Sequence, residues 1–441
     1  MTSNKQIDSL PEPPGDRGLP LIGETISFLT DPNFNRKKEE KYGRIYQTNI
    51  FGNPTVISIG ADANTFLFRN ENKYVVSTWP KSTRILLGKQ SLAVNNGSFH
   101  TSRRKLLYQA FQPRALTSYI PTMAQITDAY LQKWSQMETL TWYPELRDYT
   151  FDIASNLFVG TDGGSQTPLG HHFEAWCAGL FTLPISLPWT KFGKALKARQ
   201  KLLENIEQIV IKRQQSEDSG EDALGLLIQA KDEEGNSLTL KELKDQILLL
   251  LFAGHETLTS AIASFCLLTA QHPEVMERLR AEQDSLNITG TPTLEDFKEM
   301  TYLDMVLKEV MRLVPPVGGG FRKAIQTFEL GGYRIPEGWT IQYQIAQTHQ
   351  DEDLYPESDR FDPERFAADN TVDKASFGYI PFGGGLRECI GKEFARLEMR
   401  LFASKLLKDY QWELIPDQNL DLITVPSPRP RDGLKVKFNR R

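Results

Sequence analysis

The sequence predicts a mainly helical α+β fold in which small β-sheets accompany a large helical part. Apolar residues recur at helical spacing over about 100–315 and again over about 391–409, most regularly along Leu238–Gln271. Two shorter regions, about 40–60 and 327–345, instead combine β-type runs with Gly-, Pro- and Asn-containing turns. Long helical stretches with strands confined to two short regions are typical of a helix-dominated α+β protein.

The elements follow in order from local signals. Prolines and glycines crowd the lead-in, residues 1–25, which should therefore be extended. The β-type runs 44–50 and 54–59 are separated by a Phe-Gly-Asn-Pro turn. Residues 349–388 are rich in Pro, Gly and Asp without periodicity, and irregular segments of that length are often functional. Although roughly 150 residues per domain would suggest about three domains, no change of composition marks a linker, and we expect one domain over 1–441.

Composition excludes several classes of protein. The 51 Lys and Arg residues against 56 Asp and Glu residues give a net charge of −5, which argues against a basic nucleic-acid binder. The longest apolar run, Ile247–Ala253, is far shorter than the roughly 20 residues that a bilayer requires. The N-terminus is polar, and three cysteines are too few for a disulfide framework. We therefore expect a soluble cytoplasmic protein without a membrane anchor.

The most informative segment is a glycine-rich loop that contains a cysteine. Residues 382–392 read Phe-Gly-Gly-Gly-Leu-Arg-Glu-Cys-Ile-Gly-Lys, and Cys389 stands just before a predicted helix. Glycines allow a loop to wrap closely around another group. A helix N-terminus stabilises a thiolate through its dipole, and its free N–H groups can hydrogen-bond a metal-bound sulfur. The pattern therefore favours Cys389 as a metal ligand.

Two other interpretations of this loop were considered. A P-loop needs four residues between its glycines and Ser or Thr after the lysine. Here five residues separate Gly385 from Gly391, and Glu393 follows Lys392, so the P-loop fails on both counts. The second alternative is that Cys389 is merely a small apolar residue at a helix start.

The spacing Phe-x-x-Gly-x-Arg-x-Cys-x-Gly resembles the haem-binding loop of the cytochrome P450 superfamily of haem-thiolate monooxygenases. The resemblance implies a cytochrome P450 fold, with haem b between a long distal helix and a proximal cysteine loop. It further implies that Cys389 is the axial ligand of the iron, that Arg387 binds a propionate, and that Phe382, Gly383 and Gly391 contact the cofactor. Thiolate ligation favours O–O bond cleavage.

A second motif lies in the predicted helix around residues 248–257. This helix is apolar nearly all round and should be buried, and a buried acid such as Glu256 is rare unless it is paired or functional. Gly254 costs roughly 1 kcal/mol relative to alanine, and Thr257 can donate to the carbonyl of Ala253. The alternative is a buried helix with one satisfied threonine.

This string resembles the superfamily's Ala/Gly-Gly-x-Asp/Glu-Thr motif. The resemblance implies that Thr257 acts at the dioxygen, that Glu256 takes part in proton delivery, and that Gly254 contacts the haem. Leu258 stands where a hydroxyl residue is often found.

Other charged residues gain meaning from the same resemblance. Glu309 and Arg312 are spaced i,i+3, which alone is a commonplace ion pair. With Arg365 they resemble the superfamily's Glu-x-x-Arg helix and its partner arginine, which implies a structural ion network.

Three further residues are expected to reach the propionates. His100 and Arg104 have the spacing of the superfamily's Trp-x-x-x-Arg, the alternative being a solvated basic helical turn, and Arg322 is the third. His349 is a weaker candidate.

The resemblance is closest to the retinoid hydroxylase branch. Pro13–Gly15, Gly18–Thr25 and Trp79-Pro80 look like that branch, whose animal members carry a membrane anchor, so the chain is similar to soluble bacterial members. The implied reaction inserts one oxygen atom from O2 into a C–H bond of a hydrophobic substrate, such as retinoic acid or another apocarotenoid. Candidate pocket residues are Trp79, Phe181, Ala253, Val317 and Val425, with Arg84 as a candidate for a substrate carboxylate.

No flavin or iron–sulfur signature is present, so electrons are expected from a ferredoxin-type partner. Its candidate docking residues are Arg103, Lys105, Lys392 and Arg396, and the chain is expected to be a monomer. Two other functions remain open: a haem-thiolate peroxygenase or isomerase that needs no electron partner, and a non-catalytic haem or retinoid carrier. The Gly-x-Glu-Thr string argues against the first.

Overall fold

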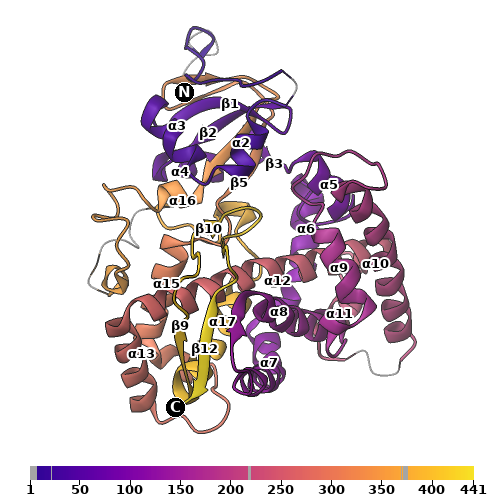
Figure 1. The fold of residues 1–441 in the computed structure, drawn as a ribbon. Helices are drawn as coiled ribbons and strands as arrows, with labels where there is room; N and C mark the ends of the chain where they lie inside the picture. Colours follow the sequence, from indigo (N-terminus) through magenta and orange to yellow (C-terminus); the bar gives the residue numbers. More distant parts are fainter. Residues whose placement is uncertain (1–6, 21, 217–219, 369, 371–375) are drawn as a thin grey trace. The chain divides into compact units, whose positions relative to one another are not determined.

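The structure is a computed structural model that describes residues 7–20, 22–216, 220–368, 370 and 376–441. Residues 1–6 and 21 of the predicted lead-in lie outside this set. The chain divides into two compact units, each drawn within Figure 1. Unit 1 comprises residues 1–81, 311–389 and 423–428, and unit 2 comprises residues 82–310, 390–422 and 429–441.

Unit 1 is built on a five-stranded mixed sheet with the order β1-β2-β8-β5-β3. Its strands are β1 (Ile45–Ile50), β2 (Asn53–Ser58), β3 (Val75–Ser77), β5 (Gly319–Ala324) and β8 (Thr340–Gln344), and a separate hairpin joins β6 (Phe328–Leu330) to β7 (Tyr333–Ile335). The helices are α2 (Thr25–Thr30), α3 (Phe34–Tyr42), α4 (Ala61–Arg69) and α16 (Ile345–Thr348), with 3-10 turns η3 (Pro363–Phe366) and η5 (Gly385–Arg387).

The sheet of unit 1 is half-buried in the way that its sequence alternates. In β1 the side chains of Tyr46, Thr48 and Ile50 are buried while their neighbours are partly exposed, as the two-residue period of a strand requires. β1 runs antiparallel to β2, whereas β2 runs parallel to β8. The core beneath the sheet includes Leu67 and Phe68 of α4, which fixes α4 next to the cysteine loop.

Unit 2 is almost entirely helical. Its helices are α5 (Lys81–Leu87), α6 (Gly97–Tyr108), η1 (Gln109–Phe111), α7 (Pro113–Trp134), α8 (Trp142–Val159), η2 (Gly164–Gln166), α9 (Pro168–Cys177), α10 (Lys191–Gln214), α11 (Ala223–Gln229), α12 (Leu240–Gln271), α13 (Pro273–Leu286), α14 (Asp296–Glu299), α15 (Thr301–Leu313) and α17 (Lys392–Asp409), of which α5 and α15 cross the unit boundary. The short strands are β4 (Leu140–Thr141), β9 (Tyr410–Leu414), β10 (Leu422–Ile423), β11 (Arg429–Pro430) and β12 (Lys435–Arg440), of which β4, β12 and β9 form one sheet.

Helix α12 is the central element of unit 2, and α8 packs along it (Figure 1). It begins with a capping box in which the Thr239 hydroxyl accepts from the N–H of Glu242 and the Glu242 carboxylate accepts from the N–H of Thr239. α12 is long and apolar enough by composition to cross a membrane, but 72% of its most apolar window is buried inside the protein. That burial is typical of the core helix of a folded domain.

The predicted α+β class is confirmed, and the main elements lie where the sequence places them. α12 and α17 match the predicted helices, and β1 and β2 match the predicted hairpin. Strand β5 was not predicted, because its start, Gly319-Gly320, has the composition of a loop. It forms because its backbone pairs with β8, a partner that local sequence does not reveal.

Candidate active site

The cysteine loop closes on itself at the end of unit 1. The backbone N–H of Cys389 donates to the carbonyl of Phe382 at 2.9 Å, and the N–H of Gly383 donates to Ile380 at 2.9 Å. Gly383 and Gly385 have φ of +69° and +64°, a region that favours glycine. This fold leaves Cys389 exposed, so the loop presents its sulfur rather than burying it.

Packing against α4 requires glycine at two positions of the loop, Gly384 and Gly385. A Cβ on Gly384 would lie 2.7 Å from the Phe68 ring, and one on Gly385 would lie 2.8 Å from the Phe68 carbonyl oxygen. By contrast, a Cβ on Gly391 would meet Phe111 at an ordinary 3.5 Å, and its φ is −91°. Nothing in the structure explains why position 391 is glycine.

A buried carboxylate joins two of the predicted propionate ligands in unit 1. Arg322 Nε lies 2.6 Å from Glu71 Oε2, and Arg387 Nε lies 3.3 Å from Glu71 Oε1. The side chains of Glu71 and Arg322 are 1% and 4% exposed. Glu71 also accepts from the N–H of Ser77 at 2.9 Å. Sequence reasoning missed Glu71, because an isolated acid carries no motif.

This trio fits the cofactor that the cysteine loop implies. Two guanidinium groups share one carboxylate, so Glu71, Arg322 and Arg387 together carry one net positive charge close to the loop. Guanidinium groups bind carboxylates strongly and with defined geometry. A haem propionate is a carboxylate, and an exposed cysteine sulfur beside such arginines is the donor set that a haem-thiolate site needs.

In unit 2, the motif of α12 reaches the accessible surface within an otherwise buried helix. Ala253 is exposed and Thr257 partly exposed, whereas Glu256 and Leu258 are buried. The Thr257 hydroxyl donates to the Ala253 carbonyl at 2.8 Å, as predicted. Ala253 and Thr257 therefore face the same accessible side of the helix, on which a reacting molecule could bind.

Gly254 has a packing role that the sequence did not reveal. A Cβ at this position would lie 2.8 Å from the Phe158 ring of α8. The missing side chain thus allows α8 and α12 to approach closely.

The buried acid Glu256 is paired with Arg147 of α8. Arg147 Nη1 lies 2.8 Å from Glu256 Oε1, and the Glu256 side chain is 6% exposed. Arg147 also donates to both carboxylate oxygens of Glu174, at 2.6 and 2.7 Å. Burial alone would lower the pKa of Arg147, but the charges of Glu256 and Glu174 outweigh it and raise that pKa. The guanidinium is therefore a permanent positive charge beside Glu256.

The remaining predicted propionate ligands lie on α6 in unit 2. His100 is buried, with 5% of its surface exposed, and Arg104 is partly exposed one helical turn later. Residues four apart share a helix face, so the two side chains are presented together.

The three residues of the predicted structural ion network are all buried. Glu309 and Arg312 are fully buried and Arg365 is 9% exposed. Arg312 donates to the carbonyls of His349 and Arg360, at 2.9 and 3.1 Å, and Arg365 donates to those of Pro356 and Glu357. Through these backbone carbonyls, both arginines hold irregular segments of unit 1 in place.

His349 is a structural residue rather than a propionate ligand. Its Nε2 accepts from the N–H of Ile380 at 2.9 Å, and its Nδ1 lies 3.2 Å from the carbonyl of Arg312. Burial and the charge of Arg312 lower its pKa to about 3. Both ring nitrogens are used and the ring is fully buried, so the prediction that His349 reaches a propionate is wrong.

The candidate substrate residues are divided between the units. Trp79 and Val425, both partly buried, and Val317, 38% exposed, belong to unit 1. Phe181, partly buried, and Ala253, exposed, belong to unit 2. Arg84, the candidate for a substrate carboxylate, is exposed on α5.

The candidate docking cations have acidic neighbours. Arg103 lies 2.7 Å from Glu242, Lys105 lies 2.6 Å from Glu233, and Arg396 lies 3.0 Å from Glu393. Arg103 and Lys105 also line an open pocket of about 680 Å³ in unit 2. A partner that binds these cations would have to compete with the chain's own carboxylates.

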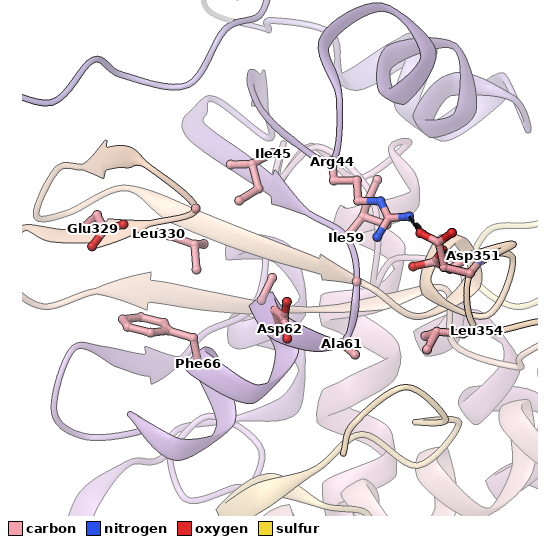
Figure 2. A pocket seen from close by; sticks show the side chains of 14 residues that line it. Arg44, Ile45, Ile59, Ala61, Asp62, Phe66, Glu329, Leu330, Asp351 and Leu354 are labelled. Carbon is pink, nitrogen blue, oxygen red and sulfur yellow. Dashed lines mark hydrogen bonds and ion pairs between the residues drawn. The ribbon is translucent and has the colours of Figure 1, made fainter. Parts of the chain in front are cut away.

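A second pocket, of about 560 Å³, lies in unit 1 away from the predicted site residues (Figure 2). Acidic side chains line it, among them Asp62, Glu329 and Asp351. Its arginine, Arg44, already binds Asp351 at 2.8 Å, as the dashed line in Figure 2 marks. None of the residues predicted to bind haem or substrate is among the residues lining this pocket.

The chain is similar to known proteins over nearly its whole length. The family model for "Cytochrome P450" matches residues 13–438. "Putative cytochrome P450 120" of Synechocystis is 52% identical over 440 residues, covering 100% of this chain and 99% of that protein. "Cytochrome P450 26B1" of Homo sapiens is 36% identical over 445 residues, covering 97% of this chain and 87% of that protein.

A solved structure, "Retinoic acid bound cyanobacterial CYP120A1", is 53% identical and superposes with a TM-score of 0.94, covering 98% of this chain and 100% of that one. The match of the family model over nearly the whole chain agrees with the exposed cysteine, the arginine pair and the acid–alcohol turn described above. The chain therefore belongs to the cytochrome P450 family.

Proposed function

We propose that this cytochrome P450 monooxygenase hydroxylates a retinoid or related apocarotenoid, such as retinoic acid. The observation that carries the proposal is the cyanobacterial structure with retinoic acid bound, to which this chain is 53% identical over 98% of its length. Family membership assigns haem b as the cofactor and O2 as the co-substrate. A hydrophobic substrate suits a site whose candidate lining residues are mostly apolar.

Haem, when bound, activates dioxygen so that one oxygen atom enters a C–H bond and the other leaves as water, with two electrons and two protons consumed. Cys389 would hold the iron. Arg322, Arg387, His100 and Arg104 would bind the propionates, and Phe382, Gly383, Gly391 and Gly254 would contact the cofactor.

The chain's own residues divide the remaining work on the distal side. Arg147 keeps the Glu256 carboxylate in place, 2.8 Å away. Thr257 presents its hydroxyl oxygen, whose hydrogen is donated to Ala253, on the open side of α12. We assign Glu256 to proton delivery and Thr257 to binding at the oxygen. Trp79, Phe181, Ala253, Val317 and Val425 would line the substrate pocket and exclude water.

The test combines binding with turnover. Purified holoprotein is titrated with all-trans-retinoic acid while the haem absorption spectrum is followed, and then incubated with retinoic acid, O2, NADPH and a surrogate ferredoxin and reductase. We expect a saturable spectral change and a product one oxygen atom heavier than the substrate. Saturable binding without product would identify a carrier. Equal turnover with hydrogen peroxide and no reductant would identify a peroxygenase, and absence of binding would exclude retinoids.

We also propose a soluble cytoplasmic monomer, acting as one domain, that takes electrons from a ferredoxin-type protein. The match of the family model from residue 13 to residue 438 supports one functional domain. Alanine substitution of Arg103, Lys105, Lys392 and Arg396 should slow reduction by ferredoxin without changing the affinity for retinoic acid. Unchanged reduction rates would exclude this docking surface.

A further inference from the structure

His255 is a fully buried titratable residue that the proposed function leaves unused. It follows Gly254 on α12, and the rings of Phe151 and Phe173 pack edge-on against it at centroid distances of 5.5 Å. Its Nε2 lies 3.7 Å from Glu174 Oε1 and 3.8 Å from Glu256 Oε1. Within the described part of the chain, Nε2 has no hydrogen-bond partner.

The hydrogen bonds on the other side of the ring indicate which nitrogen keeps a proton. Nδ1 lies 2.8 Å from the hydroxyl of Thr150, which itself lies 2.7 Å from the hydroxyl of Thr259. The two hydroxyls also donate to backbone carbonyls, Thr150 to Leu146 and Thr259 to His255, each at 3.0 Å. These contacts already need more hydrogens than two hydroxyls hold. We therefore assign Nδ1 as the donor to Thr150, which leaves Nε2 as the nitrogen available for proton transfer.

The charges around Nε2 leave room for one additional proton. Two carboxylates, Glu174 and Glu256, face one guanidinium, that of Arg147, so the cluster is one negative charge in excess when the His255 ring is neutral. A proton on Nε2 balances it. A bare Nε2 lone pair would instead face two anions across less than 4 Å of buried space, which is unfavourable.

Tyr143 and Cys177, which also lie close to Glu256, do not supply that charge. Burial raises the pKa of Tyr143 and of Cys177, and nearby Glu256 raises both further, so both stay neutral. Burial acts to raise the pKa of Glu174 as well, but the nearby His255 ring and the charge and hydrogen bonds of Arg147 outweigh it and bring that pKa to about 2. Glu174 therefore remains an anion, with its Oε1 3.7 Å from His255 Nε2.

The two carboxylates differ in their access to solvent. The Glu174 side chain is 53% exposed, whereas that of Glu256 is 6% exposed. His255 Nε2 lies between them, and a shift of about 1 Å toward either would bring it to hydrogen-bonding distance. The His255 ring thus lies within 4 Å of both Glu174, which is exposed at the surface, and Glu256, which is buried on α12.

We propose that His255 is the proton donor to Glu256, reloaded from solvent at the Glu174 side. In the transfer the Nε2–H bond breaks and an O–H bond forms on Glu256. The neutral ring keeps its proton on Nδ1, which donates it to the hydroxyl oxygen of Thr150 in a hydrogen bond. A solvent proton arriving beside Glu174 restores the Nε2–H bond, and no electrons move. The inference rests on the proposed role of Glu256 in proton delivery and names the group that supplies it.

The decisive variant is His255→Asn, whose amide can still donate to Thr150 but carries no exchangeable charge at the Nε2 position. The matched control is His272→Asn, at the end of the same helix, where the ring bonds the Leu268 carbonyl. For His255→Asn we expect product formed per NADPH consumed, with the surrogate ferredoxin system, to fall on the order of tenfold. The solvent deuterium isotope effect should rise, while peroxide-driven turnover and the affinity for retinoic acid stay at the wild-type values.

Glu174→Gln supplies a second variant that keeps the shape of the site. It should lower coupling in the same direction, because the solvent-side anion is lost. In addition, ring 15N spectra of the reduced, carbon-monoxide-bound holoprotein should show one histidine, absent in His255→Asn, whose Nδ1 stays protonated while Nε2 changes state with pH.

Wild-type coupling and isotope effect in both variants, or a ring protonated permanently at Nε2 and bare at Nδ1, would overturn the assignment. Failure of the proposed function would look different. If Glu256 had no part in proton delivery, Glu256→Gln would itself leave coupling unchanged. If retinoids were not substrates, wild-type protein would give no product.

Discussion

The guanidinium of Arg147 lies 2.8 Å from the carboxylate of Glu256 and binds both oxygens of Glu174 as well. Arg147 of α8 therefore sets the position of the Glu256 carboxylate on α12. The relationship explains how a carboxylate can be buried at 6% exposure beside an apolar helix face. A buried carboxylate is tolerated when a charge and hydrogen bonds compensate it.

Removing Arg147 should therefore cost both stability and turnover. Arg147→Ala leaves Glu256 buried without its cation, and we expect a loss of about 3 kcal/mol in the free energy of unfolding. Urea unfolding measures the stability, and product per NADPH measures the function. Arg147→Lys, which keeps the charge, should recover most of the stability. Equal losses in both variants would show that the charge is not what matters.

The Glu71 carboxylate should be needed to retain haem. Glu71→Gln leaves Arg322 and Arg387 without their shared anion, so their positions near the cysteine loop should no longer be fixed. We expect faster haem loss, measured by transfer to apomyoglobin. Glu12→Gln removes a more exposed ion pair with Arg334 and should change the rate little, because such pairs contribute about 0–1 kcal/mol. Identical rates in the two variants would contradict the role assigned to Glu71.

Sequence alone could single out candidate chemistry-bearing residues but not the side chains that hold them. Cys389, Glu256 and Thr257 stand in short strings whose spacing is informative, and the long apolar helix and the β1–β2 hairpin follow from periodicity and turn residues. Arg147 and Glu71 belong to no string. They can be identified only in the folded structure, where α8 packs beside α12 and Glu71, which follows α4, contacts Arg322 of β5.

Gly254 is a second case in which sequence alone does not reveal the packing partner of a residue. Its motif was recognised, but the reason for a glycine there lies in Phe158, on another helix. No local pattern reports which side chain will press against a given position. For the same reason strand β5, which begins with Gly319 and Gly320, was not predicted although its backbone pairs with β8.

Gly254→Ala should destabilise unit 2 by overpacking. The new Cβ would lie 2.8 Å from the Phe158 ring, and we expect a cost of about 1–3 kcal/mol, measured by urea unfolding. The double variant with Phe158→Leu should recover part of it. Gly318→Ala, where no atom lies within 4 Å of a new Cβ, serves as the control. A fully stable Gly254→Ala protein would show that α8 and α12 are not closely packed at this point.

His349 should make the folded state sensitive to acid. Its pKa is lowered from 6.5 to about 3, so below pH 6.5 the unfolded chain binds a proton that the folded chain refuses. Stability should fall as pH falls from 6.5 toward 3, by on the order of 5 kcal/mol in full. Urea unfolding at pH 7.5 and 5.5 measures the slope. His349→Gln should flatten it relative to wild type, whereas the exposed His171→Gln should not; equal slopes in all three proteins would contradict the prediction.

The proposed function depends on ligation of haem iron by the sulfur of Cys389. The most direct measurement is the absorption spectrum of the purified protein after reduction with dithionite and exposure to carbon monoxide. We predict a Soret band far to the red of that of a histidine-ligated haem, lost in Cys389→Ser and retained in Cys177→Ser. Absence of haem, or a spectrum that does not change when Cys389 is replaced, would contradict the account.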